Sequence, residues 1–139
     1  MVNTQVGYAL KQAQSLLHVR MEEALKPLNL TVSQYSCLHR LRREPGISAA
    51  GLARATFVTR QSMNALLQQL IDRGLVARPT QAESGRALPA LLTDAGAEAL
   101  DAAQSLVDGV QRRMLRGFTA TETAALEQAL AACIRSLEE

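Results

Sequence analysis

The stretch 59–74 constrains the fold most, because it combines the start and stop signals of a helix with two faces of opposite chemistry. Thr59 is a preferred N-cap residue, and Val58 before it can pack against Met63. Gly74 supplies the left-handed residue that ends many helices. Apolar residues recur at three- and four-residue steps and predict one buried stripe, formed by Met63, Leu66, Leu67, Leu70 and Ile71.

The opposite face of this helix carries side chains that suit the reading of DNA bases. Arginine can bind guanine, asparagine and glutamine can bind adenine, and alanine can pack against the methyl group of thymine. The same residue types are also common on solvated helix surfaces that read nothing, so this face needs support from its neighbours. The residues on it are Arg60, Gln61, Asn64, Ala65 and Gln68.

Three further helices are predicted before this stretch. A long helix over 5–26 ends at Pro27, and a second over 32–43 follows a capping box at 31–34. A short third helix begins after the N-cap Ser48 and ends near Ala55. Only three residues then lead into 59–74, which predicts a helix, a tight turn and a second helix.

After Gly74 the apolar period changes from near 3.6 to near 2, which predicts two short strands over 75–80 and 86–92. A hairpin at this place is a wing, in which Pro79 and Pro89 must take edge or solvent-facing positions. Two long helices should follow, one over 94–116 after the cap Thr93 and one from a capping box at 119–122 to Leu137. The predicted fold is therefore mostly α with a small β-hairpin wing.

Composition agrees with one helical domain. The 139 residues include few aromatic residues and no tryptophan, so aliphatic residues must fill the core. We find neither an apolar run long enough to span a membrane nor a secretory signal, and we expect a cytoplasmic protein without a membrane partner. Cys37 and Cys133 both lie in apolar helical patterns and are expected to be free, buried thiols.

The basic residues are concentrated in the middle of the chain. Residues 40–86 hold eight arginines and three acidic residues, whereas the rest of the chain holds more acidic than basic residues. Every basic residue in this middle region is arginine, which suits contact with phosphates and bases. The charge pattern therefore favours a nucleic-acid partner for the region that contains the helix-turn-helix.

Metal binding and catalysis receive little support from the sequence. Cys37 and His39 are two positions apart on a helix and point to nearly opposite sides, so they do not form a metal site with His18. His18 and Glu22 form a possible pair four residues apart, which an ordinary helix-surface contact explains. No phosphate-binding loop and no nucleophile paired with a base is present, so no cofactor, metal or catalytic residue is expected.

The order of these elements and several motifs resemble the MarR family of bacterial transcription regulators over nearly the whole chain. The second helix begins with LTVSQYSCL from Leu30, the helix-turn-helix ends with LIDRGLV from Leu70, and the wing closes with LTDAG from Leu92. The resemblance implies a winged helix-turn-helix homodimer that binds pseudo-palindromic operator DNA and is often released by a small ligand. It divides the chain into dimerisation helices at 1–30 and 94–139 and a winged helix-turn-helix at 31–93.

One departure from the family pattern affects the wing. At 84–87 the chain reads SGRA where the family commonly has Asp-Arg-Arg-Ala, so the usual aspartate and the first arginine are absent. Arg86 is the arginine that remains for contact with the minor groove, and Glu83 is a candidate for a substitute brace. The departure leaves open whether the wing binds DNA as strongly as is usual in the family.

Two hypotheses of function follow. The first is a homodimeric, sequence-specific DNA-binding repressor that a small aromatic effector releases, and the alternative is a dimeric protein-interaction module of the same fold with weak or lost operator binding. The predicted DNA-binding residues are Ser48, Arg54, Thr59, Arg60, Gln61, Ser62, Asn64, Ala65, Gln68, Arg78 and Arg86. The predicted effector contacts combine an apolar body with a polar tip: Tyr8, His18, Tyr35 and His39.

Overall fold

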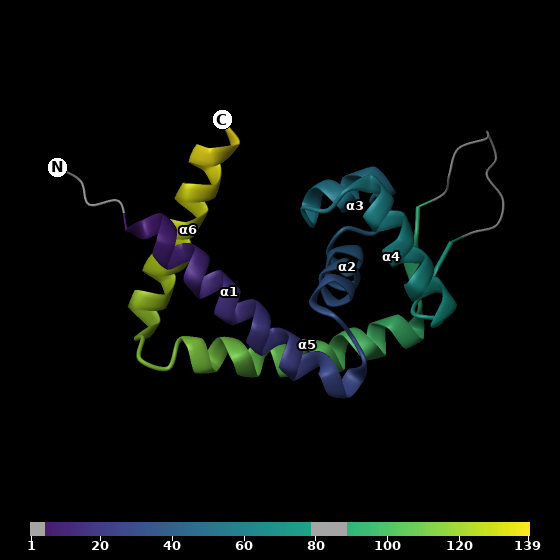
Figure 1. Cartoon of the computed structure of the whole chain (residues 1–139). Helices are drawn as coiled ribbons and strands as arrows, with labels where there is room; N and C mark the ends of the chain where they lie inside the picture. Colours follow the sequence, from purple (N-terminus) through teal and green to yellow (C-terminus); the bar gives the residue numbers. More distant parts are fainter. Residues whose placement is uncertain (1–4, 79–88) are drawn as a thin grey trace.

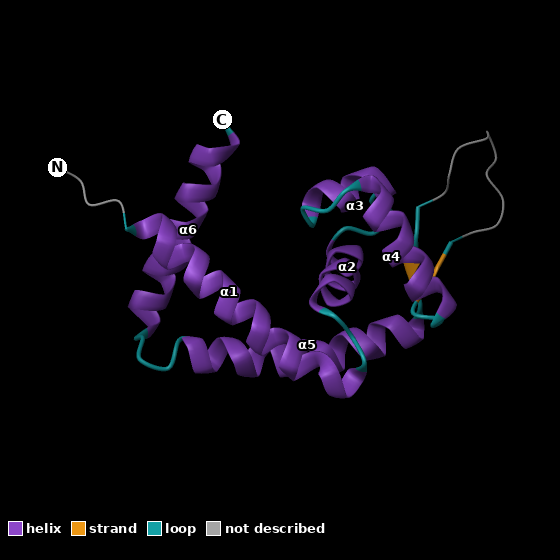
Figure 2. Ribbon diagram, viewed as in Figure 1, coloured by secondary structure: helices purple, strands orange, loops and turns teal. Residues whose placement is uncertain are grey.

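The computed structural model describes residues 5–78 and 89–139, and it is almost entirely helical (Figures 1 and 2). One two-stranded antiparallel hairpin interrupts the helices, as predicted. The elements in chain order are α1 (Val6–Leu25), the 3-10 helix η1 (Lys26–Leu28), α2 (Val32–Arg43), α3 (Ala49–Ala55), α4 (Arg60–Asp72), β1 (Val76–Ala77), β2 (Leu91–Leu92), α5 (Asp94–Met114) and α6 (Ala120–Glu138).

The helices form two groups that α5 connects (Figure 1). Helices α2, α3 and α4 gather with the hairpin near the start of α5, whereas α1 crosses α5 and α6 turns away from its far end. The start of α1 and the end of α6 therefore lie on the side opposite α3 and α4. Residues 31–93, which hold α2, α3, α4 and the hairpin, are called the reading unit below.

The hydrophobic core lies in the group formed by α2, α3, α4, the hairpin, the end of α1 and the first part of α5. Of the predicted stripe on α4, Met63, Leu67 and Leu70 are buried, and Leu66 and Ile71 pack against the core while partly exposed. The other buried hydrophobic residues are Leu25, Leu30, Tyr35, Cys37, Leu38, Leu41, Leu52, Ala53, Leu75, Val76, Ala90, Leu100, Ala103 and Val107.

The predicted helix starts are confirmed by their hydrogen bonds. The hydroxyl groups of Ser48, Thr59 and Thr93 each accept a backbone N–H three residues later. Full capping boxes begin α2 and α6, where the N-cap threonine and the third helical residue cap each other's backbone. Gly74 has the expected left-handed backbone, with φ of 74°.

The turn between α3 and α4 contains a feature that the sequence does not indicate. Phe57 has φ of 59°, in the left-handed region that aromatic residues rarely adopt, and its side chain is 95% exposed. Apolar packing by the described residues therefore does little to offset the cost of this backbone conformation.

The hairpin packs closely against the start of α5. Val76 pairs with Leu92 and Ala77 pairs with Leu91, and the predicted tip, including Pro79 and Arg86, lies outside the described residues. A Cβ atom added to Gly96 would lie 2.0 Å from the carbonyl oxygen of Leu75. Glycine at this position therefore lets α5 start directly against the wing.

The flanking helices expose apolar side chains. Helix α6 has no buried residue, and Leu25 is the buried residue of α1. Cys133 on α6 is exposed, so the expectation that both cysteines are buried is wrong for this one, because α6 packs on no core of its own chain. None of the described helices is both long and apolar enough to cross a membrane.

Candidate nucleic-acid interface

The predicted reading face of α4 is exposed in the structure. All five of its side chains are accessible to solvent, while the buried residues on the other side of the helix fix its orientation against the core. The helix therefore presents a polar surface on a rigid support, which is the arrangement that a base-reading helix needs. The exposed residues are Arg60, Gln61, Asn64, Ala65 and Gln68.

Two hydroxyl groups at the start of α4 have different tasks. Thr59 Oγ1 accepts the N–H of Ser62 at 3.0 Å and donates its own proton to Ser62 Oγ at 2.9 Å. Thr59 is therefore committed to capping the helix, whereas Ser62 keeps its hydroxyl proton for an outside acceptor. The N-terminal end of a helix favours anions, so a phosphate oxygen suits this position.

Gln68 is engaged by its own helix in the free protein. Its side-chain amide donates to Asp72 Oδ1 at 2.9 Å, so the amide must leave this carboxylate before it can contact a base. Gln61 and Asn64 have no such side-chain partner among the described residues, and they can reach a base edge without breaking a bond. We therefore rank these two residues above Gln68 as base-reading residues.

The predicted contacts outside α4 are placed unequally. Ser48 is exposed and caps α3 through the N–H of Gly51 at 3.0 Å, and Arg54 is exposed near the end of the same helix. Arg78 follows β1 and is partly buried. Arg86 lies outside the described residues, so its prediction rests on the sequence alone.

Some arginines of the basic middle region serve the fold. Arg42 forms an ion pair with Asp101 on α5 at 2.5 Å, and Arg73 donates to the carbonyl oxygen of Asn29 at 2.7 Å. In contrast, Arg54 and Arg60 form no ion pair within the part of the chain that the structure describes. The charge that is free to meet phosphates is therefore smaller than the number of arginines indicates, and it includes Arg54 on α3 and Arg60 on α4.

Two of the predicted effector contacts lie close together, with Tyr35 buried and His39 partly exposed. The rings of Tyr35 and His39 are 5.8 Å apart, and the Tyr35 hydroxyl donates to Gln104 on α5 at 2.9 Å. Burial raises the pKa of Tyr35, and burial together with the charges of Arg43, Arg42 and Arg40 lowers the pKa of His39. Both groups are therefore neutral at neutral pH.

The other two predicted effector contacts lie elsewhere. Tyr8 is 77% exposed on α1. His18 lines a cavity of about 180 Å³ between α1, the start of α2 and the helix-turn-helix. The remaining residues that line this cavity are Val32, Ser33, Ser36, Thr56, Val58 and Leu66, so it offers apolar walls and three hydroxyl groups.

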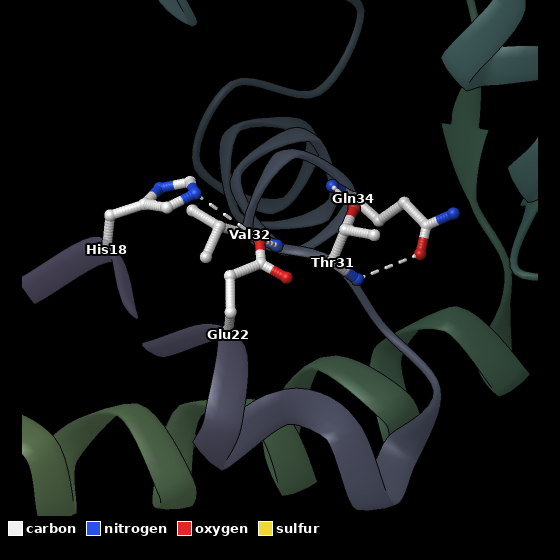
Figure 3. Close-up of polar contacts among 5 residues, drawn as sticks. All are labelled: His18, Glu22, Thr31, Val32 and Gln34. Carbon is white, nitrogen blue, oxygen red and sulfur yellow. Dashed lines mark hydrogen bonds and ion pairs between the residues drawn. The ribbon is translucent and has the colours of Figure 1, made fainter. Parts of the chain in front are cut away.

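A polar contact beside this cavity links α1 to α2 (Figure 3). Glu22 Oε1 accepts the backbone N–H of Val32 at 2.8 Å and lies 3.7 Å from His18 Nε2. The spacing of His18 and Glu22 indicates their pairing in the sequence, but no sequence signal indicates the bond to Val32, ten residues away. Sequence reasoning therefore identified the pairing of Glu22 with His18 but missed its contact with α2.

Cys37 lies fully inside the core on α2. Burial raises the pKa of its thiol to about 12, so the reactive thiolate is scarce at neutral pH. This environment supports the interpretation of Cys37 as a small core residue.

Comparisons with known proteins agree with this geometry. A sequence model described as "MarR family" matches residues 28–87. The chain is 41% identical over 117 residues to the HTH-type transcriptional repressor Rv2887 of Mycobacterium tuberculosis, covering 84% of each chain. It is also similar to two crystal structures of the Rv2887 protein. The complex with DNA has a TM-score of 0.80 and 35% identity over 94% of this chain and 98% of that chain. The complex with salicylic acid has a TM-score of 0.78 and 37% identity over 94% and 97%.

Proposed function

This chain belongs to the MarR family, and we propose that it is a transcriptional repressor that binds operator DNA as a homodimer and is released by a small aromatic acid. One observation carries the DNA-binding part of the proposal. Helix α4 has a capped N-terminus and a buried apolar side, and it presents Arg60, Gln61 and Asn64 to solvent. The solved complex of the Rv2887 protein with DNA supports this assignment.

Within the reading unit, we assign different roles to different residues. Gln61 and Asn64 read base edges in the major groove, because their amide groups are exposed and free of intrachain partners among the described residues. Arg54, Arg60 and Ser62 contact phosphates or a neighbouring base, which positions the helix. Arg86 is proposed, from the sequence alone, to reach the minor groove or the DNA backbone.

The homodimer part of the proposal rests on exposed apolar residues of the flanking helices. A single chain leaves the apolar side chains of α1 and α6 in water, including Val6, Leu10, Leu16, Leu130 and Ile134. A second copy that covers them would place two reading helices about 10 base pairs apart, in successive major grooves on one side of the DNA. The residues 1–30 and 94–139 then form the dimer, and 31–93 form the reading unit.

The effector part of the proposal rests on the cavity beside His18. Its apolar walls and its hydroxyl groups suit a single aromatic ring that carries polar substituents. The Rv2887 protein has been solved with salicylic acid, which is a ligand of this chemistry. Of the four residues predicted to contact an effector, His18 lines this cavity, and we assign the contact to it.

Binding of the protein to DNA from its own upstream region tests the proposal. We expect tight binding to a segment of this DNA, much weaker binding to a scrambled segment of equal length, and release by millimolar salicylate. Equal affinity for both DNAs would contradict operator recognition and favour the interaction module. Sedimentation should give about 30 kDa, twice the 15.0 kDa of one chain, and a monomer at micromolar concentration would contradict the dimer.

A further inference from the structure

The start of α2 is capped by a carboxylate from another helix. A helix leaves its first backbone N–H groups without partners inside the helix. At α2, Thr31 Oγ1 accepts the N–H of Gln34 at 3.0 Å, and the Gln34 side chain accepts the N–H of Thr31 at 3.1 Å. The N–H of Val32, the first residue of α2, donates to Glu22 Oε1 at 2.8 Å (Figure 3). Glu22 on α1 therefore caps a third backbone N–H at the start of α2.

This bond connects the two groups of helices. Glu22 belongs to α1, which the proposed function places in the dimer, and Val32 belongs to the reading unit. A negative charge is favourable at the positive end of a helix, so the bond gains from the charge of Glu22 as well as from its geometry. The bond thereby contributes to the angle at which the reading unit sits on the dimer.

The same carboxylate contacts two residues that line the cavity described above. His18 Nε2 is 3.7 Å from Glu22 Oε1, and both His18 and Val32 line the cavity. An acid whose carboxylate pairs with His18 must therefore place its negative charge beside that of Glu22. Two carboxylates that both contact His18 repel each other, and they repel more strongly in a partly buried site than in water.

We propose that Glu22 transmits the binding of an acidic effector to the DNA-reading helices. The effector carboxylate pairs with the His18 side chain and displaces Glu22 from the N–H of Val32. The reading unit can then turn relative to α1. The ligand shifts the equilibrium because it binds better when Glu22 has moved away than when Glu22 is in place. This inference rests on the proposed function, since it specifies how the effector acts on DNA binding.

Glu22→Gln separates the charge of this residue from its shape. The amide oxygen still accepts the N–H of Val32, so DNA binding without effector should stay within about threefold of the native protein. A neutral amide does not repel salicylate, so salicylate should bind the variant at least as tightly. The factor by which saturating salicylate weakens DNA binding should fall at least tenfold, because the ligand then binds both states about equally well.

Glu23→Gln is the matched control. Glu23 is the next residue of α1, and it pairs with Arg20 at 2.9 Å instead of facing α2. This variant removes the same charge from the same helix, so it should keep the native response to salicylate. Salicylamide, a neutral analogue of salicylate, should release the native protein much less than salicylate does at equal occupancy.

A second measurement follows the bond itself. The backbone amide of Val32 should exchange slowly with deuterium in the free protein and faster when salicylate is bound. In Glu22→Gln the exchange rate should not change on salicylate binding. This readout does not depend on DNA, and a loss of helix stability alone would speed exchange in both states.

The outcomes distinguish the inference from the proposed function. If native protein fails to bind its upstream DNA, or binds it and is not released by salicylate, the proposed function fails and this inference fails with it. If native protein is released and Glu22→Gln is released by the same factor, the proposed function stands and the role of Glu22 is refuted. Loss of response in Glu22→Gln but not in Glu23→Gln would support the inference.

Discussion

Replacing Gly96 with alanine should destabilise the protein through one backbone contact. Gly96 lies in the first turn of α5, and a Cβ atom there would be 2.0 Å from the carbonyl oxygen of Leu75. An ordinary contact begins near 3.4 Å, so the first turn of α5 and the start of the wing must separate by about 1.4 Å. The clashing atom belongs to the backbone and cannot move aside by a change of rotamer.

Three contributions determine how much Gly96→Ala changes the free energy of unfolding. Overpacking of this kind costs about 1–3 kcal/mol, and the upper end applies because two backbone segments must shift. The carbonyl oxygen of Leu75 also accepts the N–H of Thr93 at 3.1 Å, and weakening this bond costs about 1 kcal/mol. Alanine is about 1 kcal/mol more favourable than glycine inside a helix, which offsets part of the loss. The free energy of unfolding should therefore fall by about 2–3 kcal/mol.

Gly109→Ala is the control in the same helix. The nearest atom to an added Cβ at Gly109 is Arg112 Nη2 at 3.6 Å, which is an ordinary contact. This variant should gain up to about 1 kcal/mol from helix propensity. Urea unfolding of both variants at one protein concentration measures the difference, because the stability of a dimer depends on concentration. An unfolding free energy for Gly96→Ala equal to that of the native protein would refute the reasoning.

Four further predictions concern DNA binding, backbone strain and thiol chemistry. Gln61→Ala and Asn64→Ala should each cost about 1–3 kcal/mol on the operator and little on scrambled DNA, as fluorescence anisotropy would measure; equal losses on both DNAs would show that this face does not read sequence. Arg86→Ala should weaken binding to most sequences and reduce the slope of log K against log salt by about one unit for each phosphate that the variant no longer binds; an unchanged slope would contradict a phosphate contact. Phe57→Gly should raise the unfolding free energy by about 0.5–1 kcal/mol, because glycine adopts positive φ freely and the exposed ring gains little from packing; a decrease would contradict strain at this turn. Cys37 should resist iodoacetamide at pH 8 until the protein unfolds, and rapid labelling of the native protein would contradict its burial. Because burial raises the pKa of this thiol to about 12, the neutral thiol stabilises the folded state fully below the unfolded pKa of about 8.5, and this stabilisation is lost as the pH rises toward 12.

The helices could be predicted closely because their signals are local. Thr31, Thr59, Thr93 and Thr119 cap helices at the expected positions, and the apolar stripe of α4 faces the core as its spacing indicates. Each of these signals depends on residues within about one turn of the helix, so the sequence displays it directly.

Contacts between distant elements could not be predicted in the same way. The LTDAG motif that begins at Leu92 is recognisable, but the reason for its glycine is the approach of the Leu75 carbonyl, twenty-one residues before it. The bond from Val32 to Glu22 also depends on how α1 meets α2, which no residue pattern states. The apolar neighbours of Cys133 predict its burial, yet α6 has no buried residue on the single chain.

The candidate site shows the same division. Exposure of the reading face follows from the helical period, so its residues are predictable from spacing. The engagement of Arg42 by Asp101 and of Gln68 by Asp72 is not predictable from the number of charges, because that number does not say which side chain already has a partner. Composition and spacing thus predict which surface can meet DNA, whereas the structure identifies the groups that are free to do so.

Helix α5 is a rigid connection between the reading unit and the flanking helices α1 and α6. Its first half contacts the reading unit through Gly96, Asp101 and Gln104, and its second half faces α1 across a cavity that Leu16 and Leu17 help to line. Its 21 residues span about 31 Å at about 1.5 Å per residue. A tilt of only about 6° at one end therefore displaces the other by about 3.4 Å, the rise of one base pair. The spacing between the two reading helices of a dimer must match the spacing between the two half-sites on the DNA. A tilt of this size is therefore enough to shift one reading helix by one base pair from its half-site.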